Sequence, residues 1–568
     1  MQGAYLAVYG DAATQAVALP HLREYFAAPG FALYGTPDLK LCRIGGDACL
    51  IGEVFDRDGK PVDPTSLAIH HKPEQLRNYL LQQLWGCYLL LQVDGAQMIA
   101  TLSPAAAGNV PCVYSGNNRR GFLTSDISLA IEAGCYERRV DWEALGHRLL
   151  YPGIKPQNTA LAGLKELLPG TSLHVEPSGI SVRQAWSPWN FVGPSARHAT
   201  ADEAAQSVRQ AVEYAVRALA TTDGSTLLEL SGGLDSSIVG ACLVGAPCEV
   251  VCVNLLTPVP GVDERHYAEQ VARALGTPLH VEPLPFERAR LAFQPSPASV
   301  LPGMGPLQHA IDGIMSEAAD RHGVRSYVSG GGGDSVFCYL RTAAPAVDAF
   351  KVSGLGAALA TVGDLSRMHQ CTFWKAARLT LSKLRRTPGP PHRANTTFLD
   401  SRLGDIPPFA HPWFSAPDGA LPGDRERIID LAGNQLFQGQ AARAQTRPFR
   451  FPLLSQPVME ACLRAPTWMW IAGGQNRAVA RAAFSHKLPA EVLHRQSKAT
   501  YIGYLGAVYQ QRKHEIGTFL LEGQLAERGL LDAASIRTFL RSPLPARDQT
   551  FLRLFELCMI ENWARHQP

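Results

Sequence analysis

The chain has 568 residues, of which 46% are hydrophobic and 18% are charged. These values are ordinary for a globular protein and allow two or three domains. Fifty-three basic and 50 acidic side chains leave a net charge of +3, which gives no overall electrostatic case for a nucleic-acid or membrane-surface partner but leaves local basic patches open.

Cysteine usage and the N-terminus bear on the compartment. The 12 cysteines include no Cys-x-x-Cys pair, so no zinc site is predicted, and scattered single cysteines are typical of a reducing compartment. The first residues lack a positive segment, and Asp11 interrupts the early apolar run. No later apolar run approaches the length of a membrane span. We therefore expect a cytoplasmic protein without a membrane span.

The first third of the chain alternates short β-rich runs with turns. The clearest predicted strands are 4–9, 88–93, 98–102, 121–124 and 172–175, with a predicted helix over 73–84. Residues 187–200 contain Pro and Gly and have the composition of a linker. We predict a first domain over 1–190, a linker over 191–200 and a second domain over 201–568.

The second domain is predicted to be α/β. Apolar residues recur at helical spacing over 202–220. Predicted buried strands follow at 226–230, 248–255 and 324–329, and predicted helices begin after the first strand and at about residue 263. This strand–helix–strand order predicts a doubly wound parallel sheet, whose ligands bind at the carboxyl ends of the strands.

Residues 231–237, Ser-Gly-Gly-Leu-Asp-Ser-Ser, join the first of these strands to its helix. Glycines let the backbone approach an anion, and N–H groups at a helix start bind its charge. We expect the hydroxyls of Ser236 and Ser237 to cap this helix. Asp235 offers a carboxylate through which Mg²⁺ could bridge protein and phosphate. The Gly-Lys-Ser/Thr of a Walker loop is absent, and a plain strand-to-helix turn is the alternative interpretation.

Four glycines, residues 330–333, follow Ser329 and precede Asp334. A flexible connector is the simple interpretation of such a run. Its position between a β-rich segment and a carboxylate favours a ligand-facing loop instead.

The C-terminal half contains a basic tract and two tryptophans. The tract consists of Lys375, Arg378, Lys383, Arg385, Arg386 and Arg393. Its default interpretation is a solvated helix end and loop, and a contact surface for a peptide or partner protein is the alternative. Trp468 and Trp470 are predicted to be core residues rather than stacking groups.

Residues 231–237 resemble the PP-loop of the ATP pyrophosphatases, which cleave ATP between the α- and β-phosphates. The form Leu-Ser-Gly-Gly-Leu-Asp-Ser-Ser is similar to that of asparagine synthetases. Residues 85–88, Trp-Gly-Cys-Tyr, and 167–171, Leu-Leu-Pro-Gly-Thr, resemble segments of that family's amidotransferase-type N-terminal domain. The resemblance implies an Ntn-type β-sandwich followed by a PP-loop synthetase domain of the adenine nucleotide α-hydrolase type.

Position 2 departs from that family. Its members hydrolyse glutamine with a cysteine directly after the initiator methionine, whose freed α-amine serves as the base. Gln2 stands there in this chain. Because the thiol nucleophile is missing, we predict that the first domain is structural and releases no ammonia from glutamine.

The run Gly-Gly-Gly-Gly-Asp-Ser-Val-Phe, residues 330–337, looks most like the lasso peptide cyclases, the macrolactam synthetases that close the ring of lasso peptides. These also lack the N-terminal cysteine. Asparagine synthetases carry a glutamate, and β-lactam synthetases a tyrosine, at the position of Gly331. The missing side chain is compatible with a roomier acceptor site.

The resemblance implies roles for individual residues. The nucleotide-binding residues would be Ser231, Gly232, Gly233, Asp235, Ser236, Ser237, Val253, Ser329 and Gly330, with Val253 at the adenine. Asp235 and Asp334 would bind Mg²⁺. Arg477 falls where relatives carry a phosphate-contacting lysine, and arginine can hold phosphate bidentately. Lys498 falls on the lysine that these enzymes place beside the reacting carboxyl carbon, where a cation stabilises the oxyanion. Taken alone, Lys498 would be a surface residue.

The implied activity is ATP-dependent macrolactam formation. A side-chain carboxylate of a precursor peptide is adenylated with release of pyrophosphate, and the peptide's N-terminal amine then displaces AMP. ATP and Mg²⁺ are the expected cofactors, the precursor peptide is the substrate, and a leader peptidase and a leader-binding protein are candidate partners. No residue stands out as the general base. The alternatives are an ammonia-dependent asparagine synthetase, a β-lactam synthetase, and a non-catalytic ATP-binding scaffold.

Overall fold

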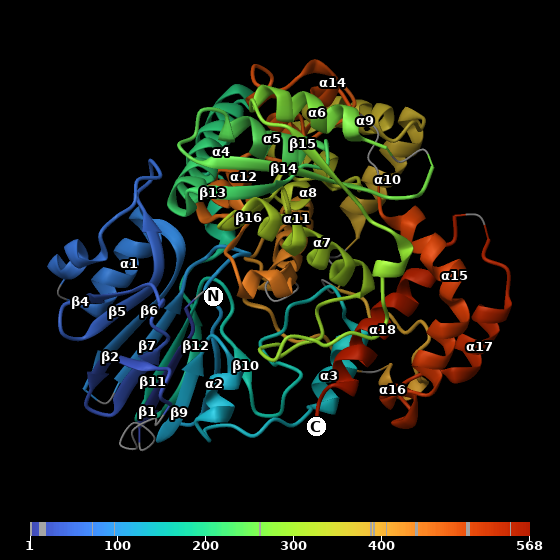
Figure 1. Ribbon diagram of the computed structural model, residues 1–568. Coiled ribbons are helices and arrows are strands. Elements are labelled where there is room, and N and C mark those ends of the chain that lie inside the picture. The colour runs from blue at the N-terminus through green and yellow to red at the C-terminus, as the bar shows by residue number, and fades with distance from the viewer. Residues whose placement is uncertain are drawn as a thin grey trace.

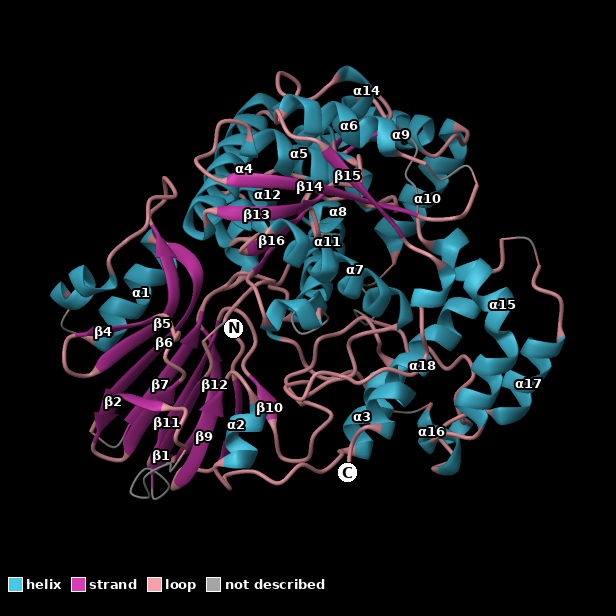
Figure 2. Cartoon of the chain, in the orientation of Figure 1, coloured by secondary structure: helices cyan, strands magenta, loops and turns pink. Residues whose placement is uncertain are grey.

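The structure is a computed structural model that describes residues 3–10, 19–70, 72–95, 97–260, 263–386, 389, 392–404, 406–437, 441–495, 500–545 and 547–568. Antiparallel sheets form the N-terminal part of the chain, at the lower left of Figure 1. A parallel sheet surrounded by helices forms most of the remainder, as the colouring by secondary structure in Figure 2 shows.

The N-terminal part is a sandwich of two six-stranded antiparallel sheets. The first sheet has the order β10 (Lys165–Glu166), β8 (Val113–Gly116), β9 (Arg120–Thr124), β1 (Tyr5–Gly10), β3 (Phe31–Gly35) and β2 (Arg23–Ala28). The second has the order β12 (Gly179–Gln184), β11 (Thr171–Glu176), β7 (Gln97–Leu102), β6 (Trp85–Asp94), β5 (Ala48–Phe55) and β4 (Leu41–Ile44). Alternate residues such as Tyr5 and Ala7 of β1 and Leu89 and Leu91 of β6 form the core between the sheets. The predicted strands and the predicted β-sandwich are confirmed.

Helices cover both outer faces of the sandwich. On the second sheet, α1 (Pro73–Gln83) packs Leu76 and Leu80 into a core with Leu50 and Leu90. On the first sheet, α2 (Ile127–Glu132) shares a core with Leu6 of β1, whereas α3 (Trp142–Leu150) lies beside α18 (Phe551–Arg565), away from the sheets (Figure 1). Each outer face of the sandwich therefore carries one helix, α1 or the short α2.

The parallel sheet has the strand order β15 (Leu279–Pro283), β14 (Glu249–Leu256), β13 (Ser225–Glu229), β16 (Ser326–Ser329) and β17 (Phe449–Arg450). Leu228 faces a core that includes α4 (Ala201–Asp223), α5 (Leu234–Leu243) and α6 (Arg265–Ala274). Its neighbour Leu227 faces α7 (Pro306–His322) on the opposite side. Helices on both faces of a parallel sheet agree with the predicted doubly wound arrangement.

The other helices follow the last two strands of the sheet. They are α8 (Gly333–Val336), α9 (Ala344–Met368), α10 (Phe373–Arg385), α11 (Pro422–Gly433), α12 (Gln456–Arg464), α13 (Ala478–Ala483), α14 (Ala490–Leu493), α15 (Ile502–Leu521), α16 (Gln524–Glu527), α17 (Ala533–Arg541) and α18 (Phe551–Arg565). A hairpin of β18 (Ile471–Ala472) and β19 (Gln475–Asn476) precedes α13. Trp470 is fully buried, as predicted, whereas Trp468 is only half-buried.

Extensive contacts join the two parts of the chain. Arg450 of β17 is buried and donates to Asp223 of α4 at 2.8 and 2.9 Å and to Glu53 of the sandwich strand β5 at 3.1 Å. Within the predicted linker region, Trp189 Nε1 donates to the carbonyl oxygen of Trp413 at 2.8 Å, and Val192 is buried. The boundaries at 190 and 200 stay a prediction, but the connection between the parts is packed.

One helix among the described residues, α9, is long and apolar enough to cross a membrane by length and composition alone, with a mean hydropathy of 1.2. Gly354 interrupts it with φ +82° and ψ −170°. This kink divides α9 into segments 344–353 and 355–368, each shorter than the about 20 residues that a helical span needs.

Candidate nucleotide-binding site

Two loops meet at the carboxyl edge of the parallel sheet. β13 runs into the loop 231–237, here called the Ser/Gly loop, and β16 runs into residues 330–333, here called the glycine loop. The strands are adjacent, with Glu229 paired to Ser329. A Cβ on Gly330 would lie 2.5 Å from the backbone N of Ser236, which no side chain could tolerate. The glycine loop is therefore packed against the Ser/Gly loop rather than a free connector.

The start of α5 lacks a side-chain cap. Its N-cap residue is Gly233, and no side chain of the described chain caps it. Ser236 instead donates to the carbonyl oxygen of Gly233 at 3.3 Å and lies 3.1 Å from Ser231 Oγ. The buried Ser237 Oγ has no partner among the described residues. The predicted caps are wrong because both serines already lie within the first turn, past the capping position. The N–H groups there face an anion site without competition from a side chain.

Asp235 and Asp334 converge on Arg477. Arg477 Nη1 donates to Asp235 Oδ1 and Oδ2 at 2.9 and 3.1 Å and to Asp334 Oδ1 at 2.9 Å. The side chains of Arg477 and Asp235 are 9% and 13% exposed, whereas that of Asp334 is 40% exposed. One cation thus neutralises two carboxylates from different loops, with Asp334 open to solvent.

These two carboxylates fit a magnesium ion. They supply hard oxygen ligands that reach one point beside the open start of α5. Within the described ranges there is no group of three or more His, Cys, Asp and Glu residues that could hold a metal. Phosphate oxygens and water would therefore complete the coordination, as is usual for Mg²⁺.

A cavity of about 340 Å³ opens beside the two loops. Of the residues predicted from the sequence, it is lined by Ser231, Gly233, Asp235, Ser236, Val253, Ser329, Gly330 and Arg477. Gly232 and Ser237 belong to the same loop without lining the cavity, and Asp334 is placed by its contact with Arg477. Lys498 lies outside the described residues, although Arg495 and Thr500 on either side line the cavity. The structure gathers the described candidates at one edge of the sheet.

Two further arginines, Arg481 and Arg495, line the cavity beside the acidic residues Glu229, Asp235, Asp263 and Glu264, and Arg495 pairs with Glu264. Burial and the neighbouring charge of Arg477 lower the pKa of Arg481 to about 10, which leaves Arg481 charged at neutral pH. Arg495 Nη1 donates to the carbonyl oxygen of Gly232 at 3.0 Å, and its guanidinium lies 4.3 Å from the ring centre of Tyr267. The sequence interpretation assigned no role to either residue. The i, i+4 spacing of Arg477 and Arg481 could have indicated that Arg481 lies on the same side of the helix as Arg477 and belongs to the site.

An ionic cluster that borders the cavity was also not predicted from the sequence. Arg443 is buried, pairs with Glu229, and contacts Asp312 of α7 through its backbone N at 2.9 Å and its Nε at 3.2 Å. Burial raises the pKa of Asp312 to about 6. Glu229 lines the cavity with 20% of its side chain exposed. Its carboxylate can therefore accept hydrogen bonds from hydroxyl or ammonium groups of a ligand. The charged Glu229 inside the apolar run Thr-Leu-Leu-Glu-Leu is the sequence feature that could have indicated this cluster.

The space next to Gly331 is filled. A Cβ on Gly331 would lie 3.1 Å from the ring of Phe451 and 3.5 Å from that of Phe437. The two rings are 5.6 Å apart between centroids. The missing side chain of Gly331 was expected to leave a roomier acceptor site. Aromatic rings instead occupy the space into which a side chain at position 331 would point, so this expectation is wrong there.

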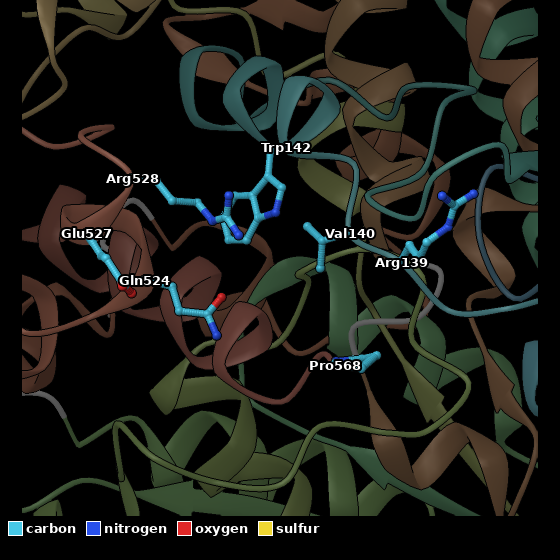
Figure 3. Close-up of a pocket in the computed structure, with 7 residues that line it drawn as sticks. All are labelled: Arg139, Val140, Trp142, Gln524, Glu527, Arg528 and Pro568. Carbon is cyan, nitrogen blue, oxygen red and sulfur yellow. The ribbon is translucent and has the colours of Figure 1, made fainter.

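A separate cavity of about 510 Å³ lies between α3 and α16. Its lining includes Arg139, Trp142 and Glu527, and the guanidinium of Arg528 stacks on the Trp142 ring at 3.7 Å, as Figure 3 shows. None of the sequence-predicted site residues lines it. The Ser/Gly loop and the glycine loop border the cavity of about 340 Å³ instead, so that smaller cavity is the candidate nucleotide site.

Comparison with known proteins identifies a family for the C-terminal part of the chain. A family model described as asparagine synthase matches residues 207–565. No curated protein matches the chain. The structure of the allosteric regulatory enzyme of purine biosynthesis is 14% identical, covering 53% of this chain and 78% of its own, with a TM-score of 0.19. Glutamine phosphoribosylpyrophosphate amidotransferase from B. subtilis, complexed with ADP and GMP, is 12% identical, covering 59% and 71%, with a TM-score of 0.19. At such TM-scores these two likenesses support no conclusion.

Proposed function

The chain belongs to the asparagine synthase family, and from this premise we propose that it closes the macrolactam ring of a lasso precursor peptide. The family supports an ATP-dependent amide ligase. The finer assignment is supported by the likeness of the glycine loop to lasso cyclases and by Gln2, which replaces the ammonia-producing nucleophile.

The proposed reaction has two steps. An Asp or Glu side-chain carboxylate of the peptide attacks the α-phosphorus of ATP, which forms an acyl-adenylate and releases pyrophosphate. The N-terminal amine of the same peptide then attacks the acyl carbon, loses a proton and displaces AMP. The adenylate is needed because a free carboxylate has no adequate leaving group, and both steps gain mainly from positioning and charge neutralisation.

The observation that carries the proposal is the meeting of Asp235 and Asp334 at one nitrogen of Arg477. The Ser/Gly loop and the uncapped start of α5 present N–H groups there, and Arg481 and Arg495 add positive charge along the cavity wall. These groups suit the triphosphate of ATP. Mg²⁺ held by the two carboxylates would neutralise the phosphate oxygens and the departing pyrophosphate. Lys498 is the proposed partner of the acyl oxyanion.

Mass spectrometry of the peptide product tests the proposal. The purified chain is incubated with ATP, Mg²⁺ and synthetic linear peptides that carry Asp or Glu within reach of a free N-terminus. The expected products are a peptide lighter by one water, AMP and pyrophosphate. Asp235→Asn should lose product formation, while Asp202→Asn, an exposed residue of α4, should retain it. Formation of ADP in place of AMP would contradict the mechanism.

The family match also favours one simpler candidate, an ammonia-dependent asparagine synthetase. Incubation with ATP, aspartate and ammonium distinguishes the two. Asparagine as the product would replace the lasso proposal and leave the amide-ligase assignment intact.

The sandwich domain is proposed to be structural. Gln2 lies outside the described residues, but its identity removes the thiol that glutamine hydrolysis needs. Release of glutamate from glutamine by the purified chain would contradict this proposal. A leader peptidase and a leader-binding protein are the proposed partners, since a precursor must expose its new N-terminus before cyclisation.

A further inference from the structure

Large apolar side chains are exposed mainly on the neighbouring helices α9 and α10. Of the ten large hydrophobic residues that the described chain exposes, seven lie here: Phe350, Val352, Leu355, Leu359, Trp374, Leu379 and Leu381. The Trp374 side chain is the most exposed, at 80%. Scattered exposed apolar residues are normal, but a gathering of them marks a binding surface. We call these seven residues and the basic residues of α10 the α9–α10 surface.

The outer face of α10 alternates apolar and basic residues. Trp374, Arg378, Leu381 and Arg385 are spaced i, i+4, i+7 and i+11, so they share one face of the helix, opposite the buried Ala376. Lys375, Leu379 and Arg386 flank this face. Trp and Leu interleaved with Lys and Arg are typical of a helix that lies in the plane of a membrane interface.

α9 extends the apolar surface without spanning a membrane. Val352 is exposed at the end of the first segment, and Leu355 and Leu359 are exposed at i, i+4 spacing in the second segment, after the kink at Gly354. Val362 and Leu365 of the second segment pack into a core with Ala376 of α10, on the side next to the exposed leucines. Because this side is occupied and the kink shortens both segments, α9 can lie on a bilayer but not cross it. The two helices lie far from the N-terminal sandwich in Figure 1.

The charge of this region is strongly positive. Residues 344–386 contain seven basic and two acidic side chains, a net charge of +5, whereas the whole chain has +3. Of the acids, Asp348 is buried and Asp364 pairs with Arg367. No described carboxylate forms an ion pair with the arginines of α10, whereas Lys383 pairs with Glu426. The exposed cations therefore fit an anionic surface.

We propose that the α9–α10 surface binds an anionic lipid bilayer, with α10 lying among the headgroups. The Trp and Leu side chains enter the interface, and the long Lys and Arg stems let their charges reach lipid phosphates. Each basic residue near such a surface strengthens binding roughly fivefold. A second copy of the chain fits worse, because the same positive surface would face itself. Protein interfaces have an apolar centre and a polar rim, whereas apolar and basic residues interleave along α10, so an acidic protein is the less favoured occupant.

Vesicle co-sedimentation of the full chain tests this proposal without any peptide substrate. We expect binding to vesicles of equal parts phosphatidylglycerol and phosphatidylcholine, little binding to pure phosphatidylcholine, and weakening by salt. Arg378→Gln with Arg385→Gln should weaken binding at least tenfold, by the same estimate per charge. The matched control, Arg119→Gln with Arg120→Gln in the β8–β9 turn, should not.

A second pair of variants tests the apolar part. Trp374→Ser should also weaken vesicle binding, whereas Ile69→Ser, which alters an apolar side chain 73% exposed on the sandwich, should not. All six positions changed in these four variants are exposed, and thermal unfolding verifies that each variant is folded. A chain that stays in the supernatant with every vesicle overturns the proposal and leaves the acidic protein as occupant. Unchanged binding by both α10 variants overturns it as well.

Discussion

Asp235 and Asp334 come from different loops of the parallel sheet, yet their carboxylates accept hydrogen bonds from the same guanidinium nitrogen of Arg477. Had the two aspartates faced opposite sides of the molecule, no single ion could have joined them. The Arg477 guanidinium therefore occupies the position that a metal ion shared by both carboxylates would need. When such an ion binds, Arg477 must break its hydrogen bonds with at least one of the two carboxylates.

Asp334→Asn is expected to weaken the binding of MgATP by roughly tenfold to hundredfold, because a charged ligand of the ion is replaced by a neutral one. Isothermal titration calorimetry with ATP in the presence and absence of Mg²⁺ measures the change. Binding of metal-free ATP should be much less affected. The control Asp202→Asn should bind MgATP like the parent, and an equal loss with and without Mg²⁺ would remove Asp334 from the metal site.

Arg477→Gln is expected to destabilise the protein in the absence of Mg²⁺ by about 1–3 kcal/mol, since the two carboxylates lose their shared cation. Added MgCl₂ should recover more stability in this variant than in the parent chain. Thermal unfolding with MgCl₂, and with NaCl at equal ionic strength, measures the difference. Recovery by NaCl as well would indicate general screening rather than a metal site.

Gly330→Ala is expected to abolish MgATP binding, because its Cβ would collide with the backbone of Ser236 at 2.5 Å and separate the two loops. Gly313→Ala in α7 is the matched control, since a Cβ there meets nothing within 4 Å. In a helix interior the control should stabilise the fold by about 0.5–1 kcal/mol. Calorimetry and denaturant unfolding measure both effects. A Gly330→Ala variant with normal MgATP affinity would disprove the need for close packing of the loops.

Arg450→Met is expected to lower the free energy of unfolding by about 3–5 kcal/mol, because it leaves Asp223 buried without its cation and leaves Glu53 with Lys40 alone. Arg447→Met, three residues earlier, removes an ion pair with Asp320, whose side chain is 69% exposed, and should cost less than about 1 kcal/mol. Urea unfolding of the two variants gives the comparison. Similar losses in both would mean that the buried pair contributes no more than a surface pair.

Asp348→Asn is expected to flatten the pH dependence of stability. Burial and the neighbouring charge of Asp424 raise the pKa of Asp348 to about 7, far above the value of about 3.9 in an unfolded chain. Between these pH values the folded state binds a proton that the unfolded state does not, so stability falls as pH rises, by up to about 1.4 kcal/mol per unit. Urea unfolding from pH 4.5 to 8 measures the slope. Parallel curves for parent and variant would contradict the assignment.

Local sequence patterns predicted much of the fold because they act over short distances. Alternation of apolar residues located the sandwich strands, and strand–helix order located the parallel sheet. The Ser/Gly loop was recognisable since it connects consecutive elements. The caps by Ser236 and Ser237 were predicted wrongly because the first residue of α5 was placed too late in the chain.

Contacts between distant residues could not be predicted in the same way. Arg443 pairs with Glu229 from 214 positions away, and nothing in the local sequence around either residue names the other. The basic tract at 375–393 was interpreted by charge alone, and only the exposure of side chains in the structure shows that Trp374 and two leucines lie on the same helix surface as its α10 residues. The filling of the space near Gly331 by Phe437 and Phe451 depends equally on tertiary packing.

The core that joins Leu6 of the sandwich to α3, α15 and α18 has a practical consequence. A truncated protein that starts at residue 201 would expose the apolar sides of these C-terminal helices to water. It would also remove Glu53, which accepts a hydrogen bond from Arg450. The two parts are therefore expected to fold as one cooperative unit, so the sandwich cannot be removed without loss of the C-terminal helices.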